Sequence, residues 1–88
     1  HLPVAFVPPQ PLERWAVVRR FEKRGGVKMR VPATLEELLR LGAEELGLTE
    51  LPVTVREVAT EALIKSVDAI QDGAVVWLLL PDEEANFH

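Results

Sequence analysis

The sequence predicts a small α+β domain in which a mixed sheet of four to five strands is covered by one main helix. Three observations support this prediction: a glycine-containing connection between two β-rich segments, a capped helix start at Thr34, and an apolar run from Ala74 to Leu80. A chain of 88 residues can bury about 60–65% of the surface that its unfolded form exposes, enough for one small core. We therefore expect a single domain.

The first two expected strands form a hairpin. Residues 15–22 are rich in β-branched and aromatic side chains, and residues 27–31 alternate apolar and basic ones, as strands do. Gly25 and Gly26 between them can adopt the positive φ that tight hairpin connections require. Their spacing does not match that of a phosphate-binding loop, so a hairpin turn is the better interpretation.

A helix is expected to begin after Thr34 and to end at Gly47. Thr34 and Glu37 have the spacing of a capping box, in which each side chain bonds the other residue's amide. A leucine stripe with helical periodicity follows. Gly42 lies inside the helix, where glycine costs about 1 kcal/mol relative to alanine, so we expect another element to approach closely there.

The rest of the chain predicts three more strands. Residues 51–58 alternate as a third strand, 62–65 fit a short fourth, 66–70 a capped helical turn, and 74–80 an apolar last strand. A continuous apolar strand belongs at the sheet centre, parallel to the first strand. This order predicts a ubiquitin-like β-grasp fold over residues 15–81, after a proline-rich arm or linker (1–14) and before an acidic flexible tail (82–88).

Composition argues against an enzyme, a cofactor and a metal site. The chain has no cysteine, and its histidines, His1 and His88, are at its two ends, where no acid or base can be held in a site. Turn and cap roles explain Asp68 and Asp72 better than cation binding does. No apolar run approaches the roughly 18 residues of a membrane span. We expect a cytoplasmic module of a larger protein, without a small-molecule substrate or membrane insertion.

The net charge of −4 conceals two oppositely charged halves. Residues 1–40 carry a net +4 and residues 41–88 a net −8. Within the first half, the basic side chains concentrate on the expected hairpin. They are Arg19, Arg20, Lys23, Arg24, Lys28 and Arg30.

Three interpretations of this hairpin are open: a solvated face, a microtubule- or nucleic-acid-binding surface, and a surface for an acidic protein. The negative net charge disfavours a polyanionic partner, whereas complementary charge orients protein encounters. The acidic half of a second copy supplies such a partner, and head-to-tail contact would build rings or filaments. The acidic candidates are Glu57, Glu61, Asp68 and Asp72.

The two tryptophans, Trp15 and Trp77, are expected in the core or at its edge, because aromatic side chains supply much of the burial in a small core. An exposed Trp15 would instead be a candidate interface anchor.

Residues 16–80 resemble the KHA domain of plant voltage-gated potassium channels. The residues that carry the resemblance are the strand and proline of 26–32, the segment 34–47, which opens with T-L-E-E-L-L and ends with L-G, and the I-Q-D-G turn of 70–73. Doublecortin-type and CIDE-N domains share much of this pattern. The KHA resemblance implies a non-catalytic β-grasp module for channel-subunit interaction or clustering. The doublecortin resemblance implies microtubule binding.

Overall fold

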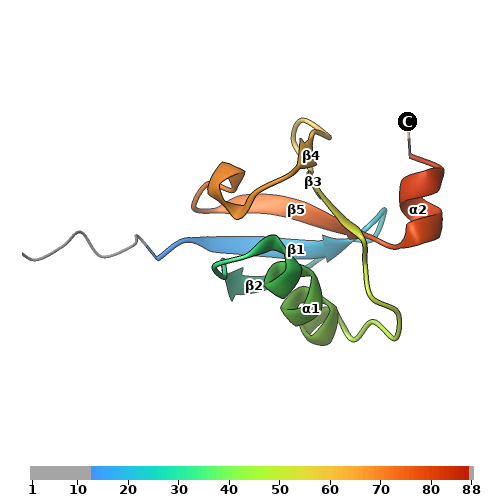
Figure 1. Ribbon diagram of the computed structural model, residues 1–88, viewed down its shortest axis with the longest axis horizontal. Coiled ribbons are helices and arrows are strands. Elements are labelled where there is room, and N and C mark those ends of the chain that lie inside the picture. Colours follow the sequence, from blue (N-terminus) through green and yellow to red (C-terminus); the bar gives the residue numbers. More distant parts are fainter. Residues whose placement is uncertain (1–12, 88) are drawn as a thin grey trace, which may run out of the picture.

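The computed structural model describes residues 13–87, so most of the arm expected over 1–14, including the P-x-x-P sequence of 8–11, lies outside the described residues. Five strands form one sheet in the order β2-β1-β5-β3-β4 (Figure 1). The elements are β1 (Trp15–Arg20), β2 (Val27–Arg30), α1 (Leu35–Leu46), β3 (Thr54–Glu57), β4 (Leu63–Ile64), a 3₁₀ turn η1 (Val67–Ala69), β5 (Ala74–Leu79) and α2 (Pro81–Ala85).

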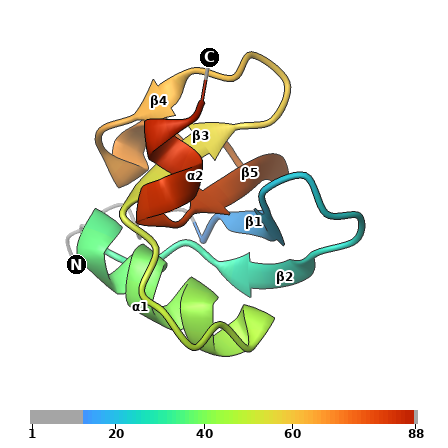
Figure 2. The same cartoon turned by 90° about the vertical axis from the view of Figure 1, so that its right-hand side faces the viewer.

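The sheet is mixed, because β1 and β5 run parallel while the other neighbouring strands are antiparallel. The expected pairing of the first strand with the last is therefore confirmed. Figure 2 shows the strand order, with β2 at one edge and β4 at the other. The predicted class is confirmed at the level of a small α+β fold with a five-stranded mixed sheet and one main helix.

Side-chain alternation divides the sheet into an inner and an outer face. The inner face is apolar and packs with α1, which contacts β1, β2 and β5 (Figure 1). Its centre is formed by Val18, Val55, Val76 and Leu78, all at most 1% exposed. The outer face carries the alternate residues of the same strands.

The helix begins and ends where its sequence predicts, with one of the two expected capping-box bonds present. The Thr34 hydroxyl accepts a hydrogen bond from the amide of Glu37 at 3.2 Å, and Gly47 closes the helix with φ of 68°. A Cβ at Gly42 would collide with the side chain of Leu78 on β5. The close approach expected at this glycine is therefore confirmed.

All five strands are shorter than the sequence predicts, the third by the most, and the ends of the first and third have clear causes. The first ends at Arg20 because Glu22 has φ of 62°, which turns the chain out of the strand. The third begins at Thr54 rather than at residue 51, where Pro52 has no N–H to add to the ladder. Val53 is 48% exposed rather than sharing the buried side of Val55.

Residues 82–88 were expected to form an acidic flexible tail, but residues 82–85 belong to the short helix α2. Pro81 stands in the first helical turn, where its missing N–H costs nothing. The Glu83 carboxylate accepts the amide of Leu80 at 2.8 Å. Side chains of this segment also bond the sheet, so the segment is held by tertiary contacts that its local composition does not reveal.

Candidate functional site

The basic hairpin places two of its six predicted residues around an exposed tryptophan. Trp15 pairs with Arg30 in the β1–β2 register, and Lys28 lies two residues away on the same face of β2. The Lys28 ammonium is 5.4 Å and the Arg30 guanidinium 5.5 Å from the Trp15 ring centroid, within cation–π range. We call Trp15, Lys28 and Arg30 the basic surface.

The other predicted basic residues lie further along the hairpin. Arg19 is on the outer face, opposite Trp77 of β5, whereas Arg20 pairs with Leu78 and so belongs to the inner side. Lys23 and Arg24 are exposed in the turn. The structure therefore does not bring all six into one patch.

Arg19 has an unpaired donor. Its Nε is buried and has no hydrogen-bond acceptor among the described residues. Such a donor costs free energy unless an acceptor reaches it.

Trp15 is 36% exposed, so it is the candidate interface anchor rather than a core residue. Its backbone is fixed on both sides: its amide donates to Asp72 Oδ1 at 2.8 Å, and its carbonyl accepts the amide of Gly73 at 2.7 Å. Arg14 next to it donates to the carbonyls of Val67 and Ile70. The indole is thus presented from a well-anchored strand end.

The four predicted acidic residues fall into two groups. Asp68 and Asp72 line a pocket at the start of β1 and β5, and Asp72 bonds Trp15 beside the basic surface. Glu57 and Glu61 flank the β3–β4 turn, where Glu57 accepts the Thr60 hydroxyl at 2.8 Å. Only the second group lies away from the basic surface.

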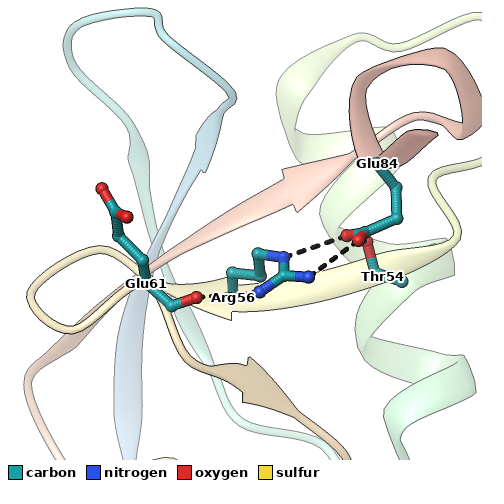
Figure 3. Close-up of polar contacts among 4 residues, drawn as sticks. All are labelled: Thr54, Arg56, Glu61 and Glu84. Carbon is teal, nitrogen blue, oxygen red and sulfur yellow. Dashed lines mark hydrogen bonds and ion pairs between the residues drawn. The ribbon is translucent and has the colours of Figure 1, made fainter. Parts of the chain in front are cut away.

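Sequence reasoning missed a polar cluster that joins α2 to the outer face of β3. The Arg56 guanidinium binds both carboxylate oxygens of Glu84, at 3.0 and 2.8 Å, and Glu84 also accepts the Thr54 hydroxyl at 2.7 Å (Figure 3). Arg56 also donates to the carbonyl of Glu61 at 2.9 Å. The only sign of this cluster in the sequence is Arg56, which alternates with the valines of the expected third strand.

The ion pair between Arg56 and Glu84 stabilises this cluster. The hydrogen bond from Arg56 is the main cause that lowers the pKa of Glu84, and the bond from Thr54 adds to it. The same bond raises the pKa of Arg56. With side chains only 17% and 26% exposed, this is the least exposed ion pair among the described residues, and it fixes α2 against the sheet.

Within residues 13–87, no group of three potential metal ligands comes together. No helix in that range is long and apolar enough to cross a membrane.

No family model, curated protein or solved structure matches this chain.

Proposed function

We propose that this chain is a non-catalytic protein-interaction module that self-associates or tethers its parent protein to an acidic protein surface. The observation that carries the proposal is the exposed Trp15 between Lys28 and Arg30. Tryptophan and arginine are enriched among residues that dominate binding at protein interfaces. Basic side chains around such an anchor select an acidic partner and speed the encounter.

We further propose that the fold is a β-grasp of the KHA kind. Support comes from the central parallel pair of first and last strands, the hairpin at one edge and the single covering helix. In this arrangement the basic surface adjoins β2, a strand with one free edge among the described elements. A partner can therefore contact the side chains of the outer face and the backbone of this edge together.

A second copy is the first partner to test. Light scattering of the full chain at low salt and rising concentration should show a mass above that of the monomer. The mass should fall as salt is added, because exposed charges are screened within about 8 Å at physiological ionic strength. A monomer at every concentration would overturn self-association.

A matched pair of charge reversals tests the surface. Lys28→Glu should reduce association, whereas Lys65→Glu, an equal charge change at an exposed residue outside the basic surface, should reduce it much less. Trp15→Ala should act like Lys28→Glu. Equal effects of the two lysine variants would show that net charge, and not this surface, controls association.

The alternative is a microtubule- or nucleic-acid-binding domain that uses the same hairpin. An exposed indole flanked by cations favours it, because such rings also stack on bases. The net charge of −4 and the Asp72 carboxylate at the Trp15 amide oppose it. Cosedimentation with microtubules and a single-stranded nucleic acid titration separate this alternative from protein binding.

A further inference from the structure

The outer face carries a second candidate site, at the end opposite Trp15. A surface pocket of about 460 Å³ opens between the hairpin turn, the β3–β4 turn, β5 and the end of α2. It does not include the basic surface, and it shares only Glu61 with the acidic residues considered for self-association. Its lining residues are Phe21, Glu22, Glu61, Trp77, Asn86 and Phe87.

Three aromatic rings meet in this pocket. The Phe21 and Trp77 centroids are 5.1 Å apart with the planes at 87°, and the Phe87 ring lies 5.6 Å from Phe21 and 6.4 Å from Trp77, tilted by 59° and 65°. Rings tilted in this way form a corner rather than a stack. Because the centroids are so close together, one atom seated against them can lie within about 6 Å of all three, the range of cation–π attraction.

One ring of the cluster already binds a cation within the molecule. The Arg56 guanidinium lies 4.0 Å from the Phe87 ring centroid. The bidentate ion pair with Glu84 compensates the charge of this guanidinium. Arg56 therefore does not leave a full positive charge at the pocket.

Two carboxylates stand at the rim of the pocket. Glu22 and Glu61 have φ of 62° and 64°, a left-handed conformation that non-glycine residues rarely adopt. Neither forms an ion pair with another residue of 13–87, and the Glu61 carboxylate points away from Arg56 (Figure 3). In the strand register Trp77 lies between Arg19 of β1 and Arg56 of β3, and the charge of Arg56 is compensated by Glu84. The rim therefore favours a cation.

We propose that this aromatic corner binds the alkylated ammonium of a methylated lysine side chain on a partner protein. Methyl groups spread the positive charge and weaken its hydration, so the ammonium gains from contact with ring faces. The methylene stem of lysine can lie along the apolar walls while the charge contacts the rings.

A lysine side chain fits the rim better than a choline headgroup does. Choline lipids carry a phosphate close to the ammonium, and Glu22 and Glu61 at the rim repel an anion placed there. A lysine side chain brings no such anion.

Intrinsic fluorescence provides a direct test, because the chain has only two tryptophans. In a Trp15→Phe background, Trp77 is the only indole. Titration with Nα-acetyl-Nε-trimethyl-lysine amide should change its emission in a saturable way. The neutral analogue, in which carbon replaces the quaternary nitrogen, should bind at least about tenfold more weakly, since it keeps the shape but loses the cation–π attraction to several rings. Unmodified lysine and phosphocholine should also bind more weakly than trimethyl-lysine.

Variants identify the groups that bind. Phe21→Leu keeps apolar volume but removes a ring, and should weaken binding several-fold. Glu22→Gln, a change at an exposed turn residue that leaves the core intact, should weaken binding about threefold and reduce its salt dependence. Arg19→Gln should strengthen binding, because it removes the nearby positive charge.

Equal affinity for the charged and neutral analogues would overturn the proposal, as would tighter binding of phosphocholine. An unchanged affinity in Glu22→Gln would contradict the role of the rim, and this variant keeps the test valid even if Phe21→Leu unfolds. Self-association is measured separately, through Lys28→Glu and Trp15→Ala at the basic surface, and ligand binding through Phe21→Leu and Glu22→Gln, so either proposal can fail alone.

Discussion

The two tryptophans lie on the same outer face of the sheet, yet their surroundings are opposite. Trp15 begins β1, and Trp77 on β5 pairs with Arg19, four residues further along β1. Trp15 is 36% exposed and flanked by Lys28 and Arg30. Trp77 is half-buried among Phe21 and Phe87, with two carboxylates at the rim of its pocket. The difference arises because α2 returns to the sheet at only one end. The same face of the sheet thus offers a basic site around an exposed tryptophan and an acidic site around a half-buried one.

The largest effect should come from Trp77→Ala, because it removes the centre of the aromatic cluster. We expect a loss of about 2–4 kcal/mol in the free energy of unfolding. Urea denaturation followed by circular dichroism measures it. A loss as small as that of Trp15→Ala would mean that α2 and the rings contribute little to stability.

The second-largest effect should come from acid, which should destabilise the end of the sheet that contains Trp77. The pKa of Glu84 is lowered in the folded state by Arg56 and Thr54, so its contribution to stability is complete above the ordinary carboxyl value of about 4.3. That contribution is lost as the pH falls through the lower folded pKa. Urea midpoints measured between pH 6 and pH 3 should therefore decline.

Glu84→Gln is the control for this pH dependence. It should be less stable than the parent at pH 6 and show a smaller decline toward acid. An equally steep decline in the variant would assign the acid sensitivity to other carboxylates.

Trp15→Ala should cost less than Trp77→Ala, roughly 1 kcal/mol, because more than a third of its surface is already in water. The same variant should strongly reduce association. If it instead destabilised the fold as much as Trp77→Ala, the indole would be acting as a core residue.

The smallest effect on stability should come from Lys28→Gln or Arg30→Gln. Each loses an exposed cation–π contact, and Arg30 also loses a pair with Glu13 whose side chains are 60% and 63% exposed. Such contacts contribute below about 1 kcal/mol. Thermal unfolding should barely change, which separates a binding role from a structural one.

Local patterns explain how much of the fold could be predicted. Thr34 and Gly47 bound the helix because capping depends on adjacent residues, and the apolar run before Pro81 placed the last strand at the centre. The α2 helix was missed, since its stability comes from Arg56, about 28 residues earlier in the chain.

The candidate sites were predicted less well for the same reason. Alternation along β2 placed Lys28 and Arg30 on one face, and the possible anchor role of Trp15 could be stated in advance. The joining of Phe21, Trp77 and Phe87 depends on three segments that are distant in sequence. No periodicity within a single segment contains that information.

The parallel pairing of β1 with β5 also determines when the molecule can fold. The two strands are joined in register from Ala16–Ala74 to Arg20–Leu78, so the central contact closes a loop that includes most of the chain. During synthesis, the hairpin and α1 emerge well before their central neighbour. Until β5 arrives, Val18 and Leu38 lack the packing surface of Val76 and Leu78. Long-range closure of this kind slows folding, and we expect the nascent chain to remain incompletely folded until β5 has left the ribosome.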